Sequence, residues 1–308
     1  MKNIAIVKDS GCIEPIWCTH WAILCGENNI PYRIFNSYAP DFMAEIQRYC
    51  PDKVLWRSGH MLGAKEKDAF QRTFLEDEAR LKIIPDWNLH RFYDNKVLQT
   101  YLFQKENIPH PETVIFYDKQ SAEKHIMTCE YPFVVKSNAG AGSGGTRFCF
   151  NHDEAIKQVN ECFGNGIEYS KGIRESGLMY KQRYIKADGI FRIVMIGDSI
   201  GYSFYQSNRP GTLVASSQGF DSYPDTPPEL LFLSHKISRL TKWQYCMYDW
   251  IYDELNKKWL VLEITDTCGQ GHSKNRKYTY YLNDGQWEAR EENTTPQELI
   301  FRHLILAA

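Results

Sequence analysis

The glycine-rich stretch at residues 131–150, YPFVVKSNAGAGSGGTRFCF, constrains the fold of this chain more than any other segment. A short apolar run ends at Lys136, residues 137–145 are all glycine, alanine, serine or asparagine, and residues 146–150 alternate like a strand. Glycine has no side chain and accepts positive φ, so successive backbone N–H groups can converge on an anion. The pattern predicts a strand, a glycine loop and a second strand, with Lys136 reaching an anion that we expect to be a nucleotide phosphate.

Two well-known phosphate-binding patterns do not fit this stretch. Gly140, Gly142 and Gly145 satisfy G-x-G-x-x-G, but the dinucleotide fold needs a helix to begin at the third glycine, and the strand-like TRFCF follows instead. A P-loop is excluded because no Gly-Lys-Ser/Thr closes the loop. A flexible surface hairpin without a ligand is the alternative that this stretch alone leaves open.

Composition sets the class of the protein. The chain has 308 residues, 43% hydrophobic and 24% charged, which indicates a globular protein with two or three subdomains around one site. A net charge of −2 without a basic run argues against general nucleic-acid affinity. The nine cysteines form no C-x-x-C pair, so we expect reduced thiols in a reducing cytoplasm. The apolar run in MKNIAIVKDS is a predicted strand, too short for a signal peptide or membrane span.

The first ninety or so residues predict a parallel α/β unit. Its expected strands alternate with expected helices, in the order 4–7, 16–25, 32–35, 42–49 and 54–57. Ligands bind beyond the carboxyl ends of such strands. The candidate substrate contacts are therefore Asp9, Ser10, Gly11, Cys12, Arg57, Ser58, Gly59 and His60. Ordinary polar loop ends are the alternative.

Two helices are expected between this unit and the glycine loop. The charged segment at residues 64–80 predicts a helix with a solvated face rather than a site. Asn95 or Asp94 is expected to cap a second helix, which Asn-Ile-Pro at residues 107–109 ends. Lys96 falls in its first turn, where a cation opposes the helix dipole, and this hints at an anionic partner.

Antiparallel strands are expected after the glycine loop. A helix at 153–162 and a polar link at 164–177 precede the predicted strands, which cover residues 178–185, 190–196, 200–205, 248–252 and 259–264. The last two would form a hairpin with Asp249 and Glu263 on facing strands. Two carboxylates there make an oxygen-rich site suited to magnesium. Pairing of each acid with a lysine or arginine is the alternative.

In this order, the segments DNKVLQTYLFQKENIPHPET, YPFVVKSNAGAGSGG, KQRYI, DGIFRIVMIGD and YDWIYDE…WLVLEI resemble the ATP-grasp enzymes, the superfamily of D-alanine–D-alanine ligase, glutathione synthetase and biotin carboxylase. The resemblance implies an α/β and α+β fold, in which an N-terminal parallel-sheet domain precedes a two-lobed ATP-grasp fold with antiparallel sheets. The expected boundaries are 1–92, 93–185 and 186–308. The stretches DNK…IPHPET and NRPG…ASSQG also resemble ligase-like proteins of cell-surface polysaccharide biosynthesis.

The resemblance implies nucleotide-binding roles in several segments. Lys96 and Lys136 would bind the α- and β-phosphates from two sides. A flexible lid over the β- and γ-phosphates would comprise Gly140, Gly142, Ser143, Gly144 and Gly145. Adenine would be held, mainly through backbone groups, by Lys181, Gln182 and Tyr184. The ribose hydroxyls would lie near Asp188 or, in a shifted register, Lys186.

The resemblance also implies catalytic arginines and a metal site. Arg192 would face the transferred phosphoryl group, and Arg209 would stabilise an acyl phosphate. Asp249 and Glu263 would bind magnesium. The family usually reads Glu-x-Asn at this point, whereas this chain has Thr265 at the asparagine position, which makes Asp266 the candidate replacement ligand.

The activity that the resemblance implies is ATP-dependent ligation of a small-molecule carboxylate to an amine. The carboxylate would be activated as an acyl phosphate, ADP and phosphate would be released, and the lid would exclude water. ATP and magnesium are the expected cofactors, and neither nucleic acid nor membrane insertion is expected. A small-molecule kinase on the same scaffold and a non-catalytic nucleotide-binding module are the alternatives.

Overall fold

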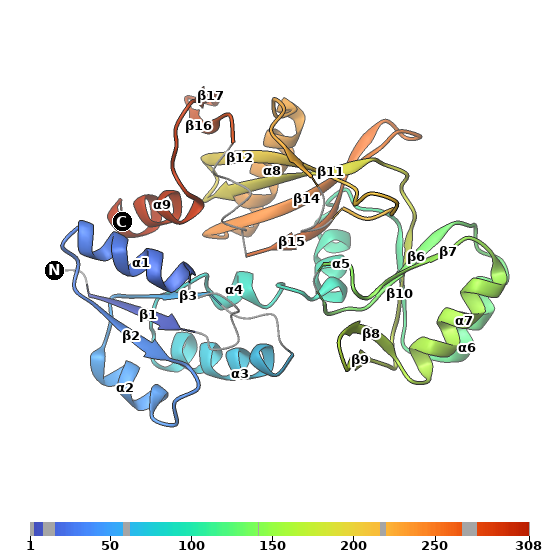
Figure 1. Cartoon of the computed structure of the whole chain (residues 1–308), viewed down its shortest axis with the longest axis horizontal. Helices are drawn as coiled ribbons and strands as arrows, with labels where there is room; N and C mark the ends of the chain where they lie inside the picture. Colours follow the sequence, from blue (N-terminus) through green and yellow to red (C-terminus); the bar gives the residue numbers. More distant parts are fainter. Residues whose placement is uncertain are drawn as a thin grey trace.

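The computed structural model describes residues 3–8, 16–57, 62–140, 142–215, 220–266 and 276–307. Its sheets follow one another along the longest axis of the molecule, from a parallel sheet near the N-terminus to a small lobe at the far end, with a large lobe beside both (Figure 1). The predicted class, a parallel α/β unit followed by antiparallel sheets, is confirmed.

The N-terminal unit is the predicted parallel sheet. Its elements are β1 (Ile4–Lys8), α1 (Ile16–Glu27), β2 (Tyr32–Asn36), α2 (Phe42–Tyr49), β3 (Lys53–Trp56), α3 (Leu62–Thr73), the π-helical η1 (Phe74–Glu78), β4 (Ile83–Ile84) and α4 (Trp87–His90). The strand order is β2-β1-β3-β4, with all pairs parallel. Arg57 follows β3 directly and so lies at the carboxyl edge of the sheet, where ligands bind in such folds.

The segment of helix α3 and η1 has exposed positions, as its charge predicts, but two charged side chains of α3 point inward. Asp68 and Arg72 are fully buried. The Arg72 guanidinium donates to the Trp56 carbonyl at 2.7 Å and the Pro85 carbonyl at 2.6 Å, and it lies over the Trp56 ring. A buried arginine is tolerated because these carbonyl groups replace its hydration. The local charge pattern could not reveal those acceptors, since they come from β3 and from the turn after β4.

The small lobe carries the glycine loop. Its elements are α5 (Lys96–Lys105), β5 (Thr113–Phe116), α6 (Lys119–Ile126), β6 (Phe133–Lys136), β7 (Thr146–Cys149), α7 (His152–Phe163), β8 (Ile167–Ser170), β9 (Ile173–Glu175) and β10 (Met179–Arg183). The antiparallel sheet has the order β5-β10-β6-β7, so the predicted hairpin around the loop is confirmed. Asn95 caps α5, as predicted, by accepting from the Leu98 N–H at 3.1 Å. The segment at 164–177 was expected to be a link but forms the two-stranded hairpin β8–β9.

The large lobe is one antiparallel sheet with a helix on one side. Its elements are β11 (Gly189–Ile196), β12 (Ile200–Ser207), β13 (Asp221–Ser222), α8 (Pro228–Thr241), β14 (Tyr245–Asp253), β15 (Lys258–Thr265), β16 (Thr279–Asn283), β17 (Gln286–Arg290), α9 (Pro296–Phe301) and the π-helical η2 (Arg302–Leu306). The order is β15-β14-β11-β12-β16-β17, with β13 paired to β12. Asp249 faces Arg192 on one neighbouring strand and Glu263 on the other. The predicted facing of the two acids is therefore confirmed.

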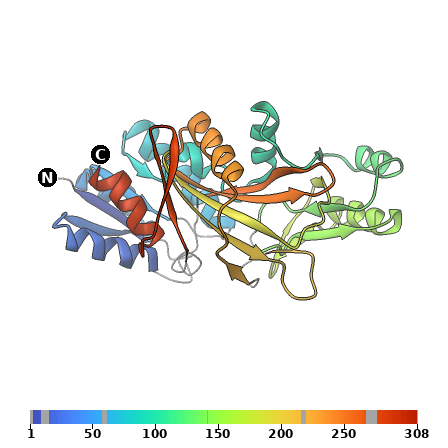
Figure 2. The same cartoon turned by 90° about the horizontal axis from the view of Figure 1, so that it is seen from above.

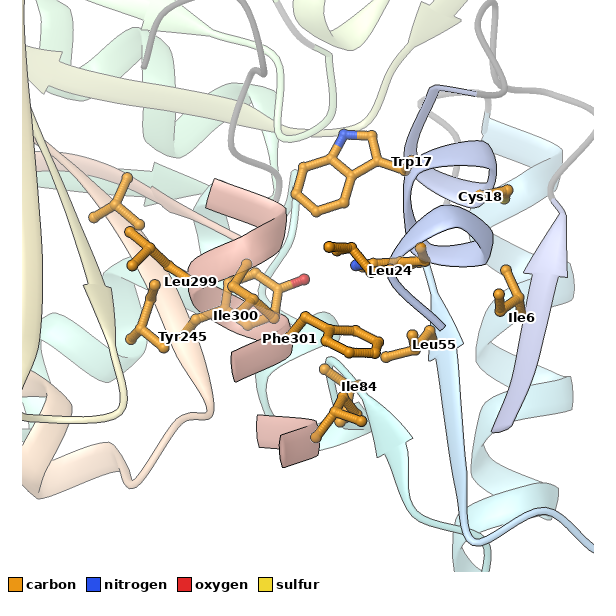
Figure 3. Packing of buried hydrophobic residues seen from close by; sticks show 14 of the residues in the cluster. Ile6, Trp17, Cys18, Leu24, Leu55, Ile84, Tyr245, Leu299, Ile300 and Phe301 are labelled. Atoms are coloured by element: carbon orange, nitrogen blue, oxygen red, sulfur yellow. The ribbon is translucent and has the colours of Figure 1, made fainter. Parts of the chain in front are cut away.

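The end of the chain returns to the N-terminal unit. Figure 2 shows α9 lying beside α1. Leu299 and Phe301 pack with Trp17 and Leu24 in a core that also includes Tyr245 of the large lobe (Figure 3). The N-terminal unit and the large lobe thus share one hydrophobic core, to which α9 contributes.

Some of the cysteines occupy such cores. Cys25, Cys149 and Cys162 are buried free thiols. Burial raises the pKa of Cys25 to about 11 and those of Cys149 and Cys162 to about 12. These thiols stay protonated at neutral pH and act as small hydrophobic side chains. Among the described residues, no helix has the length and apolar character needed to cross a membrane.

We expect Phe301→Ala to lower the free energy of unfolding by about 3–5 kcal/mol, because it empties a fully buried ring site in the shared core. Denaturant titration followed by tryptophan fluorescence measures this change. Phe232, which is 61% exposed on α8, provides the matched control, and Phe232→Ala should change stability by less than about 0.5 kcal/mol. Equal effects of the two substitutions would show that α9 is not part of the core.

Candidate functional site

A cavity of about 400 Å³ lies where the two lobes and the N-terminal unit meet. Its walls include the glycine loop, the end of β10 and the acidic strands of the large lobe. Of the residues proposed from sequence, those that line it are Arg57, Lys96, Lys136, Gly140, Gly142, Ser143, Gly145, Gln182, Tyr184, Arg192, Asp249 and Glu263. Residues separated by more than 200 positions in the chain are thus gathered around one space.

Other proposed residues do not line this cavity. They are Gly144, Lys181, Asp188, Arg209 and Asp266. Lys181 lies on the opposite face of β10 from Gln182, with its ammonium 4.9 Å from the Phe133 ring centroid. Strand alternation accounts for this, and it leaves the Lys181 backbone as the group that could reach a ligand. The candidates Asp9, Ser10, Gly11, Cys12, Ser58, Gly59 and His60 lie outside the described residues.

Asp266 has a different partner from the one expected. Its Oδ2 lies 2.6 Å from His90 Nδ1, and both side chains are buried. The preceding Thr265 lines the cavity instead. The role of Asp266 as a metal ligand stays a prediction, and reaching the cavity would require its carboxylate to leave His90.

Opposite charges alternate across the cavity wall. Arg192 Nη2 lies 3.3 Å from Asp249 Oδ2, and Lys96 Nζ lies 3.6 Å from Glu263 Oε1. Each acid of the predicted metal pair therefore has a cationic neighbour, which is the pairing that the sequence left as an alternative. The cations concerned are the ones expected to meet phosphate, so the pairs belong to the same site. Asp249 Oδ1 is buried and accepts no hydrogen bond within the described part of the chain.

Burial shifts the ionisation of these groups. Removal from water, together with the nearby positive charge of Lys96, lowers the pKa of Lys136 to about 8. Burial raises the pKa of Asp249 to about 6, although Arg192 opposes the shift. Burial lowers the pKa of Lys96, but Glu263 and Asp94 raise it by more. The site thus holds charges that are costly without a ligand of complementary charge.

The glycine loop reaches across the cavity to the large lobe. Gly140 and Gly142 have φ of +111° and +64°, and Ser143 has φ of +63°. Arg209 Nη2, from the turn after β12, donates to the Gly142 carbonyl at 2.6 Å. The positive φ values turn the loop backbone in a way that ordinary side chains rarely permit. The loop therefore closes over the cavity and is held there from the opposite lobe.

Sequence reasoning missed Asp94 and Lys65 as site residues. The Asp94 carboxylate lines the cavity 3.8 Å from Lys96 Nζ and 3.6 Å from Lys65 Nζ. Lys65 comes from α3, so the N-terminal unit reaches the site through this contact. The only local signal was the Asp-Asn-Lys sequence, which predicts a helix cap and gives no sign of the lysine on another helix.

Known proteins share both sequence and fold with this chain. Alpha-aminoadipate–LysW ligase LysX of Saccharolobus solfataricus is 24% identical over 196 residues, 62% of this chain and 68% of that protein. The 2-oxoglutarate carboxylase small subunit of Hydrogenobacter thermophilus is 22% identical over 158 residues, half of this chain but only 32% of the subunit. No protein-family model matches the chain.

Solved structures match most of the chain. D-alanine–D-alanine ligase from Bacillus anthracis superimposes with a TM-score of 0.62 and 13% identity, over 87% of this chain and 88% of that one. An ATP-grasp ligase associated with ribosomal peptides in Chryseobacterium gregarium gives a TM-score of 0.60 and 14% identity, over 89% and 92%. The chain has the ATP-grasp fold. The cavity of this ATP-grasp chain lies between its two lobes, and the glycine loop covers it.

We expect Asp249→Asn to stabilise the ligand-free protein, relative to wild type, increasingly as the pH rises. The folded state binds the Asp249 proton more tightly than the unfolded state does, so the carboxylate becomes costly between about pH 4 and about pH 6. The difference in unfolding free energy between variant and wild type should therefore grow by about 1–3 kcal/mol from pH 4 to pH 7.

Denaturant titrations of both proteins across this pH range measure the difference. Glu254→Gln is the matched control, because Glu254 is an exposed acid on the same hairpin, and its difference should not vary with pH in this way. A pH-independent difference for Asp249→Asn would mean that the carboxylate is not buried at a cost.

Proposed function

We propose that the chain is an ATP-dependent carboxylate–amine ligase that uses magnesium and an acyl-phosphate intermediate. The observation that carries the proposal is the row of Arg192, Asp249 and Glu263 on adjacent strands beneath a glycine loop with Lys136 at its base. Cations, paired acids and backbone N–H groups that face one space suit a nucleotide triphosphate and its metal.

The nucleotide would span the cavity from an apolar end to a charged end. Apolar side chains at one end are Val134, Phe148, Ile185, Ile190 and Leu262. They suit the faces of adenine, whose edge would meet backbone groups at the end of β10. Lys136 and Lys96 would bind the phosphates at the other end. Lys136 Nζ now donates to Gln182 Oε1 at 2.7 Å, a partner that a phosphate oxygen could replace.

Asp249 and Glu263 fit a magnesium ion. They form an in-register pair of hard oxygen donors, and the unused Asp249 Oδ1 is the kind of buried atom that a cation would satisfy. Magnesium held there would neutralise charge on the phosphate oxygens. Thr265 in place of the family's asparagine leaves these two carboxylates as the protein ligands that we propose.

The reaction would join two substrates in two steps. An oxygen of the substrate carboxylate attacks the γ-phosphorus, the bond to the β-phosphate oxygen breaks, and ADP leaves. The amine then attacks the carbonyl carbon of the acyl phosphate, phosphate departs, and the amine loses a proton. Arg192 would stabilise charge on the transferred phosphoryl group. Arg209 would exchange the Gly142 carbonyl for the acyl phosphate, while the glycine loop excludes water.

The substrates would enter on the side of the N-terminal unit. Arg57 lines the cavity there, with its guanidinium 5.7 Å from the Trp17 ring centroid, and we propose that it binds an anionic group of a substrate. The names of two matched ligases contain an amino acid, alpha-aminoadipate and D-alanine, which supports a small carboxylate bearing an amine as one substrate. The likeness to ligases of cell-surface polysaccharide biosynthesis stays a prediction.

We expect Lys136→Met to weaken ATP affinity by about tenfold to a hundredfold, because charged hydrogen bonds to phosphate contribute about 1.5–3 kcal/mol. With a pKa of about 8, Lys136 should also take up a proton when phosphate binds near pH 8. Calorimetry in buffers of different ionisation enthalpy measures both, and the variant should lose the proton uptake. Lys124→Met, on α6 in the same lobe, is the control. Unchanged affinity in folded Lys136→Met would rule out the assignment.

We expect hydroxylamine to trap a hydroxamate when the correct acid is supplied with ATP and magnesium, since it can intercept an acyl phosphate without the natural amine. Release of ADP and phosphate, together with product mass, identifies the reaction. Glu263→Gln should abolish turnover while only partly weakening nucleotide binding. A stable phosphorylated product would indicate the kinase, AMP would overturn the acyl-phosphate mechanism, and ATP binding without turnover across a broad acid panel would favour the non-catalytic module.

A further inference from the structure

The hairpin β8–β9 lies directly against the glycine loop. A Cβ added to Gly144 would stand 2.3 Å from the Tyr169 carbonyl oxygen, and one added to Gly140 would stand 2.8 Å from the Tyr169 ring. A Cβ at Gly145 would stand 3.0 Å from Tyr169 Cβ. Contact with Tyr169 therefore requires glycine at positions 140 and 144, and not solely the backbone freedom that a phosphate cradle needs, whereas a Cβ at Gly145 would first meet Ser137 Oγ, at 1.8 Å.

Polar contacts tie the same two segments together. The Asn138 N–H, at the start of the loop, donates to Glu175 Oε2 on β9 at 2.5 Å. At the other end, Arg147 donates to the Gly144 carbonyl at 2.8 Å and to the Glu168 carbonyl at 3.1 Å. Glu175 and Arg147 thus fasten both ends of the loop to the hairpin. Burial raises the pKa of Glu175, although the Asn138 and Ala139 N–H groups oppose the shift.

The Tyr169 side chain is built into this contact. It is 8% exposed, and its hydroxyl has no hydrogen-bond partner among the residues that the structure describes. Burial raises the pKa of Tyr169, and the nearby carboxylates of Glu175 and Asp94 raise it further. A large ring kept beneath the loop despite an unsatisfied hydroxyl indicates that its packing is what the site uses.

We propose that Tyr169 is a positioning residue, which holds the glycine loop at the height where its N–H groups can reach the phosphates. The loop is then held on one side by the hairpin β8–β9 and, in the ligand-free protein, on the other side by Arg209. This inference rests on the proposed function in assuming that phosphates bind under the loop. It adds that triphosphate affinity depends on a hairpin that contributes no residue to the cavity lining.

The experiment compares wild type with Tyr169→Ala and Gly144→Ala. The probes are the magnesium complex of a non-hydrolysable ATP analogue with an imido β–γ bridge, and AMP. Both variants should bind the analogue about tenfold more weakly. AMP, which the apolar end and β10 would hold, should bind as tightly as in wild type. Hydrogen exchange of residues 138–146 in the ligand-free protein should be faster in both variants, because the loop has lost its fixed support.

Two further variants serve as controls. Tyr169→Phe keeps the ring and should restore wild-type affinity and exchange. Tyr117→Ala removes a 61%-exposed tyrosine from the same lobe and should leave both unchanged. Gly144→Ala keeps the Tyr169 ring and gives a second test should Tyr169→Ala fail to fold.

Several outcomes would overturn the inference. They are unchanged affinity for the analogue in both folded variants, equal weakening of AMP and the analogue, and loop exchange as slow as in wild type. Failure of wild type to bind the analogue would instead refute the proposed nucleotide function. The exchange comparison, which needs no nucleotide, would still decide whether Tyr169 fixes the loop.

Discussion

The structure depends on placing several charges out of water at one point. Arg192, Asp249 and Glu263 stand side by side on three neighbouring strands, and Lys96 completes the row from α5. The strand pairing fixes the spacing, because opposed residues of an antiparallel sheet point to the same face. Asp249 and Lys96 are buried and would be expensive as isolated charges, so each requires a neighbour of opposite charge. The surrounding elements can be understood as what keeps these neighbours in place.

Such an arrangement suits an exchange of partners. In the ligand-free protein the acids neutralise the cations, and Lys136 is satisfied by Gln182. Under the proposed function, magnesium would bind the carboxylates, and the phosphate oxygens would accept hydrogen bonds from the cations. Asp249, Glu263, Arg192 and Lys96 would then have partners of opposite charge both before and after binding. Burial lowers the pKa of Lys136 and raises that of Asp249, and the charge of Arg192 offsets only part of the Asp249 shift.

Residues in regular elements were predictable, and residues defined by distant contacts were not. The facing of Asp249 and Glu263 followed from the predicted hairpin, and the cap at Asn95 followed from its side chain. The burial of Arg72 and the pairing of Asp266 with His90 depend on elements far along the chain, so no local pattern contains them. Sequence reasoning missed the hairpin β8–β9 because its strands are short and charged and lie between glycines. The expected domain boundaries stay predictions, although α9 contributes to the core of the N-terminal unit.

The return of α9 to α1 has a consequence for motion. One core combines residues of the N-terminal unit and the large lobe, and a second joins α4 and α5 to the large-lobe sheet. The core around the small-lobe sheet, in contrast, contains described residues from between Val114 and Met179 alone. The N-terminal unit and the large lobe, which come from the two ends of the sequence, are therefore joined by shared cores, and the small lobe from the middle of the sequence has a core of its own. Opening for ligand exchange would be a rotation of the small lobe relative to the other two parts, which would stay together.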